Sequence, residues 1–256
     1  MMKKCSILLL LVMLAFSCRD KSKNQETHSI PAPKTNTPFY KLGQEVFVHA
    51  LEGLSLRKTP DSKAEKIGIA PYGAILTIVA MPLPEHEYVA EKIGDFELKG
   101  HWVKVRNEEK QEAYVFDGYL THFPILVEQM KEDLADPEWF YQDLSKFKGE
   151  REVSAPNEAK GIVEGYKQAY ADGGEFEYIL YNGGITQFLR VPETTLSLQQ
   201  ALVSLRSFYY SNAKKLKTEW DAKKQVVRIL DEDSPTEWLE FGQKGKQVVV
   251  GFYSGD

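Results

Sequence analysis

The chain has 256 residues, of which 43% are hydrophobic and 27% are charged, and its formal net charge is −5. This composition is typical of globular chains with more than one domain, and it argues against intrinsic disorder and against a strongly basic nucleic-acid binder. Both cysteines lie within the first 18 residues, and all five histidines lie before residue 123. The second half of the chain therefore lacks the residue types for thiol, imidazole or zinc chemistry.

The start of the chain has the layout of an export signal. Two lysines precede an apolar run over residues 7–16, which at about 1.5 Å per residue covers about half the hydrocarbon core of a bilayer. Residues 14–18, LAFSC, resemble the lipobox of bacterial lipoproteins, with Ala15 where that motif has leucine. The resemblance implies a signal peptide over residues 1–17, a palmitate-carrying lipid anchor at Cys18 and attachment to the outer membrane. The alternative is an ordinary exported protein with a chance cysteine.

The segment after Cys18 is predicted to be a tether. Residues 19–37 are polar, with prolines at positions 31 and 33, and they cannot bury enough apolar surface to fold. We therefore expect residues 18–38 to connect the lipid to the folded body. A fully extended segment of this length reaches about 60 Å.

Residues 39–123 consist of short apolar segments separated by turn residues, which is typical of a small all-β unit. Five or six strands in this length predict a closed barrel without exposed sheet edges. Alternating apolar residues place these strands near residues 46–50, 54–56, 67–69, 75–79, 102–105 and 113–116.

Several segments of this unit resemble bacterial SH3-like domains. Residues 53–60, GLSLRKTP, are similar to the G-L-N-V-R-x-x-P opening of that family, and residues 67–78 are similar to its central glycine-containing run. Residues 100–105, GHWVKV, resemble its G-W-x-K-V strand, and residues 113–120 resemble its closing strand, with Ala113-Tyr114 in place of Gly-Trp. The resemblance implies a barrel that binds peptidoglycan or an envelope protein and carries no chemistry.

Aromatic side chains are the candidate ligand-binding residues of this unit. Tyr88 lies in a polar insertion over residues 81–99 that is longer than the family has at this place, and it is the best candidate for an exposed ring. The other candidates are Tyr72, Tyr114 and Phe116. Trp102, Val105 and Tyr119 are assigned to the core.

The histidines of this region do not predict a metal site. His86 and His101 have no second pair of spaced ligands beside them. His49 alternates with apolar strand residues, so we expect it to face solvent or to make a partly buried hydrogen bond. No cofactor is predicted.

Residues 124–154 are predicted to be a helical connector. Apolar residues keep helical spacing as far as Phe147, and Asp136-Pro137 supplies the N-cap and first-turn residues of a second helix.

Residues 155–256 predict an α+β domain of no recognised family, in which a helix covers one face of an antiparallel sheet. Asn182-Gly183 predicts a type I′ turn between two strands, and Ser197 opens a capping box and an apolar-striped helix. Residues 162–170 fit a helix better than a strand. Strands are predicted near residues 176–181, 185–191, 216–220, 226–230, 237–241 and 248–253.

The sequence thus favours a non-catalytic envelope lipoprotein that binds peptidoglycan or a partner protein and has no nucleic-acid partner. One alternative is a carboxylate-dependent wall hydrolase in the second domain, with Asp172 and Glu175 or the acidic residues 231–233 as candidates. Another is a scaffold whose barrel binds no ligand and only packs on the second domain. The oligomeric state is open.

Overall fold

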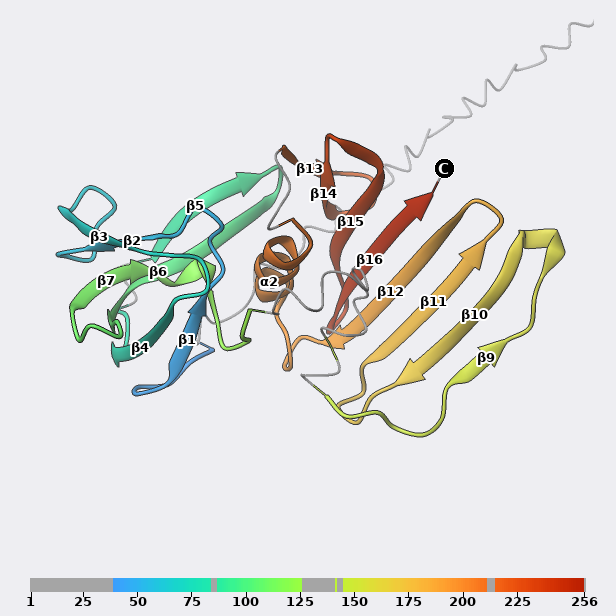
Figure 1. Cartoon of the computed structure of the whole chain (residues 1–256), viewed down its shortest axis with the longest axis horizontal. Helices are drawn as coiled ribbons and strands as arrows, with labels where there is room; N and C mark the ends of the chain where they lie inside the picture. The colour runs from blue at the N-terminus through green and yellow to red at the C-terminus, as the bar shows by residue number, and fades with distance from the viewer. Residues whose placement is uncertain (1–38, 84–86, 126–140, 142–144, 211–214, 256) are drawn as a thin grey trace, which may run out of the picture. The chain divides into compact units, whose positions relative to one another are not determined.

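The computed structural model describes residues 39–83, 87–125, 141, 145–210 and 215–255, and these residues belong to one compact unit. They form two antiparallel sheets (Figure 1). The predicted signal peptide, the lipid anchor at Cys18 and the predicted tether lie outside the described residues.

The first sheet contains the predicted strands of the small all-β unit. It is a curled half-barrel with the order β3-β2-β7-β6-β4-β1-β8, and β5 pairs with β6. The strands are β1 (Glu45–Val48), β2 (Leu54–Arg57), β3 (Lys66–Ala70), β4 (Ile75–Ala80), β5 (Glu87–Ile93), β6 (Phe96–Arg106), β7 (Glu112–Phe116) and β8 (Leu120–Thr121).

The predicted closure of this barrel is wrong. The strand order ends at β3 and at β8, and β8 has two residues that pair only with β1. Such a short strand offers too few backbone groups to close the sheet. The alternation predicted for the interior is confirmed, because Val46, Val48 and Val105 are buried inside the curl.

The insertion predicted only as a polar stretch is a β-hairpin. Its two arms are β5 and the first half of β6, which pair from Glu87↔His101 to Ile93↔Phe96. Gly94 makes the turn with a φ of 57°, a left-handed conformation that glycine adopts without steric cost.

The second sheet has the order β13-β14-β15-β16-β12-β11-β10-β9. Strands β16, β12, β11, β10 and β9 lie side by side on the right of Figure 1. The predicted hairpin and the four predicted C-terminal strands are all present. The strands are β9 (Glu152–Ser154), β10 (Ile162–Ala169), β11 (Glu175–Tyr181), β12 (Gly184–Pro192), β13 (Leu216–Asp221), β14 (Val226–Asp231), β15 (Ser234–Lys244) and β16 (Gln247–Gly255).

Two local predictions in this sheet are wrong. Residues 162–169 are strand β10 rather than a helix, because they pair with β11 from Ile162↔Tyr181 to Ala169↔Glu175. The turn at Asn182-Gly183 is not type I′, since that turn needs a positive φ at both residues and neither has one.

Helix α2 (Leu198–Tyr210) begins as predicted. The Gln200 backbone N–H donates to Ser197 Oγ at 3.2 Å, and the Ser197 N–H donates to Gln200 Oε1 at 3.1 Å, which is a complete capping box. The helix packs on β15 and β16, with Ala201, Leu202 and Leu205 fully buried. The prediction that this stripe belongs to the core is confirmed for these three residues.

A helical connector is not found among the described residues. Residues 126–140 and 142–144 of the predicted connector lie outside them. Phe147, predicted on a helical face, forms a β-bridge with Tyr170, and residues 152–154 are strand β9. No helix in the described ranges is long and apolar enough to cross a bilayer.

Candidate functional site

The half-barrel carries an aromatic cluster on its outer face. Along β6, Val103 and Val105 point into the core, so Trp102 points to the opposite side. Trp102 pairs with Phe116 of β7, and Tyr88 of β5 pairs with Gly100 of β6, which places all three rings on the same side. We call Tyr88, Trp102, Phe116 and Tyr119 the outer aromatic cluster.

Tyr88 is the accessible ring of this cluster. Its ring packs edge-on against Phe116 at 5.5 Å and tilted against Trp102 at 6.0 Å. Trp102 and Phe116 are buried, whereas Tyr88 is 38% exposed. The sequence therefore identified the exposed ring correctly, while Phe116, also a predicted ligand residue, serves as the floor beneath it.

Arg57 adds a positive charge beside these rings. Its guanidinium carbon lies 5.7 Å from the centre of the Trp102 ring, and its Nη1 donates to the Ala64 carbonyl at 2.6 Å. No carboxylate among the described residues forms an ion pair with Arg57. Tyr114, a predicted ligand residue, lies directly opposite Arg57 in the strand register and is half-buried. An arginine next to aromatic rings suits a ligand that has a carboxylate or carbonyl group.

The buried carboxylate of Asp117 lies next to the cluster and accepts a hydrogen bond that fixes the backbone of β6 there. Asp117 accepts hydrogen bonds from the Tyr40 hydroxyl at 2.5 Å and from the His101 backbone N–H at 2.6 Å. Burial raises the pKa of Asp117, and these hydrogen bonds oppose part of that rise. Gly100 leaves the space that the carboxylate occupies, since a Cβ there would lie 2.3 Å from Asp117 Oδ1.

Tyr72 does not belong to this surface. Its hydroxyl donates to the Ser207 carbonyl of α2 at 3.3 Å, so the predicted ligand residue contributes to the contact between the half-barrel and the helix. His49 lies in the same contact and is buried, with Nδ1 2.7 Å from Ser207 Oγ and Nε2 2.9 Å from the Phe123 carbonyl. The partly buried hydrogen bond was one of the two expectations for His49.

The inserted hairpin also contacts α2 and β13. The Gln199 side chain bonds both backbone groups of Lys99, accepting from its N–H at 3.1 Å and donating to its carbonyl at 2.6 Å. Arg206 of α2 donates to Glu91 of β5 at 3.1 Å. At the tip, Gly94 packs so closely on Trp220 of β13 that an added Cβ would lie 2.3 Å from that ring.

The burial of His49 predicts a loss of stability in acid. Burial lowers its pKa from 6.5 to about 4, so between these values the unfolded chain binds a proton that the folded chain does not. The free energy of unfolding is then expected to fall by up to about 1.4 kcal/mol for each pH unit below 6.5, until pH 4. Melting curves of the wild type and of His49→Gln from pH 7.5 to 4.5 test this. A constant difference between their melting temperatures over that range would contradict it.

Three of the candidate catalytic carboxylates, those of Asp172, Glu175 and Asp231, take part in local hydrogen bonds or ion pairs. Asp172 lies at the surface and accepts from Thr195 Oγ1 at 2.9 Å, from the Gly174 N–H at 3.0 Å and from the Tyr141 hydroxyl. Desolvation by the surrounding residues acts to raise the pKa of Asp172, but these hydrogen bonds outweigh it and lower the pKa. Glu175 forms an ion pair with Arg190 at 2.8 Å. In the acidic turn, Asp231 Oδ1 accepts from the Asp233 N–H at 3.0 Å.

Histidine and carboxylate groups do not gather into a metal-binding set in the described part of the chain. His101 is buried beside Asp117, with Nδ1 3.9 Å from Oδ2, and His86 lies outside the described residues. Sequence reasoning missed Arg57 and Asp117 as residues of this surface, because Trp102 beside Arg57 and Tyr40 beside Asp117 come from distant segments.

Comparison with known proteins agrees with the resemblance in the first half of the chain. Residues 52–121 match the family of bacterial SH3 domains. Neither curated proteins nor solved structures give a significant match to the chain.

Proposed function

We propose that this chain, which carries a bacterial SH3 domain at residues 52–121, is a non-catalytic binding protein of the bacterial cell envelope. Its ligand is peptidoglycan or an envelope protein, and the outer aromatic cluster is the contact surface. The observation that carries the proposal is the exposed Tyr88 ring, held over Trp102 and Phe116 with Arg57 alongside.

The chemistry of this surface fits a peptide-bearing ligand. Exposed aromatic rings over a rigid base bind without a large loss of side-chain entropy. The arginine supplies donors for a carboxylate or a carbonyl group. Peptidoglycan stem peptides offer both groups, and so does the chain of a protein partner.

Tyr88→Ala is expected to weaken binding at least about fivefold while leaving most of the stability intact, because the ring is partly exposed and not part of the half-barrel core. Co-sedimentation of the full chain with purified sacculi measures the binding, with the supernatant assayed for released muropeptides. Leu42→Ala, at another exposed apolar side chain of this unit, is the control. Unchanged binding by Tyr88→Ala, or release of muropeptides, would overturn the proposal.

A scaffold role is the second candidate, and the use of Tyr72 favours it. This predicted ligand residue contacts α2, and the inserted hairpin contacts both α2 and β13. If the half-barrel serves only to stabilise the second sheet, Tyr88→Ala is expected to have no effect on the binding of any envelope ligand.

Export and lipid attachment at Cys18 are part of the same proposal and rest on the sequence of residues 14–18. Two acyl chains are enough to make membrane attachment lasting. Cys18→Ser is therefore expected to move the protein from the membrane fraction to the soluble fraction of a bacterial host. Equal membrane fractions for the variant and the wild type would contradict lipidation at this residue.

A further inference from the structure

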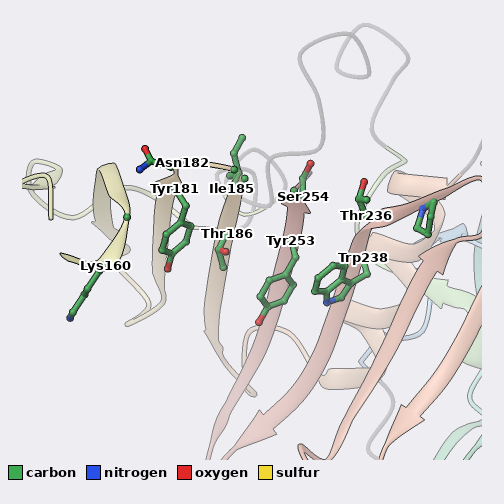
Figure 2. A pocket seen from close by; sticks show the side chains of 14 residues that line it. Lys160, Tyr181, Asn182, Ile185, Thr186, Thr236, Trp238, Tyr253 and Ser254 are labelled. Carbon is green, nitrogen blue, oxygen red and sulfur yellow. The ribbon is translucent and has the colours of Figure 1, made fainter. Parts of the chain in front are cut away.

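We propose that the second sheet carries a separate binding site for an uncharged oligosaccharide on the face opposite α2. The site is the row formed by Tyr181 (β11), Thr186 (β12), Tyr253 (β16) and Trp238 (β15), which we call the aromatic platform. It lies in an open pocket of about 570 Å³ (Figure 2). The proposal does not depend on the function of the SH3 domain.

The strand register builds this row. In β15, Leu239 and Phe241 point toward α2 and are fully buried, so Trp238 points to the other face. Trp238 pairs with Tyr253, and Tyr253 pairs with Thr186. Figure 2 shows these side chains and Tyr181 on neighbouring strands with a common direction. Four strands at about 4.8 Å spacing give a platform of about 14 Å, which is long enough for an oligosaccharide.

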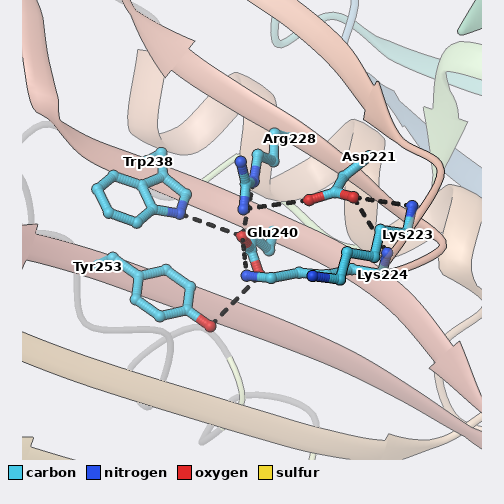
Figure 3. A network of polar contacts seen from close by, with 7 residues as sticks. All are labelled: Asp221, Lys223, Lys224, Arg228, Trp238, Glu240 and Tyr253. Carbon is cyan, nitrogen blue, oxygen red and sulfur yellow. Dashed lines mark hydrogen bonds and ion pairs between the residues drawn. The ribbon is translucent and has the colours of Figure 1, made fainter.

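The rings are held in place by a buried carboxylate (Figure 3). Glu240 accepts from Trp238 Nε1 and from the Tyr253 hydroxyl, both at 3.3 Å. The carboxylate is itself fixed by Arg228 at 2.7 Å and by Lys224 at 3.1 Å. The polar atoms of both rings are thus engaged by Glu240, and the ring orientation is set before binding.

Packing between the rings reinforces this arrangement. Trp238 and Tyr253 lie almost parallel, with ring centres 5.0 Å apart, and Phe188 meets Tyr253 edge-on at 5.8 Å. Gly251 leaves room for these rings, since a Cβ there would lie 2.9 Å from Tyr253 and 3.4 Å from Phe188. Rings fixed in this way lose little side-chain entropy when a ligand binds.

The lining determines the kind of ligand. Lys160 is the one charged side chain among the residues that line the pocket, so a polyanion such as a nucleic acid is a poor fit. Asn182, Thr186 and Thr236 supply an amide and two hydroxyls whose side chains make no hydrogen bond to another described residue. A sugar ring has an apolar C–H face for the aromatic rings and hydroxyl groups for the polar rim, and it carries no charge.

Calorimetric titration of the full chain with the tetramer of N-acetylglucosamine tests the site. We expect binding that weakens about tenfold or more in Trp238→Ala and in Tyr181→Ala. Trp238→Phe, which keeps a ring, is expected to retain most of the affinity. Leu42→Ala, at an exposed apolar side chain outside both proposed binding surfaces, is expected to retain all of it. Tyr181 has no contact with Glu240 among the described interactions, so its variant serves if Trp238→Ala does not fold.

Three results would overturn the proposal: no heat of binding with the tetramer, equal affinity in Tyr181→Ala and the wild type, or binding of an uncharged valine-threonine hexapeptide in place of the tetramer. A failure of the SH3 domain to bind sacculi is a separate result. It would appear as equal co-sedimentation of Tyr88→Ala and the wild type with sacculi, and Tyr88 does not contact the aromatic platform.

Discussion

Replacing Asp117 with alanine is expected to lower the free energy of unfolding by about 2–5 kcal/mol. The substitution removes the acceptor for the Tyr40 hydroxyl and for the His101 backbone N–H, both of which are buried. A buried donor without an acceptor costs about 1–3 kcal/mol. Urea denaturation measures the loss as a shift of the midpoint at constant slope.

Two further variants show whether the lost acceptor is the cause. Asp117→Asn keeps an oxygen that can accept from the His101 N–H, so it is expected to recover part of the stability. Glu52→Ala removes an exposed carboxylate and is expected to change stability by less than about 0.5 kcal/mol. Equal and small effects of Asp117→Ala and Glu52→Ala would show that the buried carboxylate is dispensable.

Gly94→Ala is expected to destabilise the protein by about 2–4 kcal/mol. Its φ of 57° costs a residue with a Cβ about 1–2 kcal/mol. The new Cβ would also lie 2.3 Å from Cγ of Trp220 and 2.4 Å from its Cβ. These two atoms can move away only if the backbone of β13 moves with them. Thermal or urea unfolding gives the loss.

A double-mutant cycle separates the two causes. In a Trp220→Gly background the three close side-chain atoms, Cβ included, are removed. Gly94→Ala is then expected to cost only the conformational penalty of about 1–2 kcal/mol. Gly245, which has a φ of 62° and open space around it, provides the matched control, because Gly245→Ala carries the conformational penalty alone. An equal cost of Gly94→Ala in both backgrounds would show that the hairpin tip does not contact β13.

The sequence predicts features of this fold that rest on local patterns. The capping box at Ser197 and the alternation of Val46 and Val48 are set by neighbouring residues, and the structure has both. Strand β10 was predicted as a helix because its apolar residues repeat with helical spacing. Pairing along the whole length of β11 outweighs that local preference.

Contacts between distant segments could not be predicted. Gln199 bonds Lys99 across 100 positions in the sequence, and nothing local to either residue indicates it. The candidate site was predicted in part for the same reason. The exposure of Tyr88 was predicted because this residue lies in a polar insertion. The contact of Tyr72 with Ser207 was not predicted, because its partner comes from α2.

The outer aromatic cluster shows why burial alone does not define a core residue. Trp102 is buried, as predicted, but it lies on the opposite side of β6 from Val103 and Val105. Tyr88, Phe116 and Arg57 bury it on the outside of the half-barrel. A register assignment for β6 was needed to separate these two environments.

The most direct test of the whole account is co-sedimentation of the full chain with sacculi for the wild type, Tyr88→Ala, Tyr181→Ala and the double variant. Two independent binding surfaces on one chain predict that each single variant binds more weakly and that the double variant binds least. No muropeptides are expected in the supernatant. Sedimentation of the double variant at the wild-type level would contradict the account, because neither surface would then contact the cell wall.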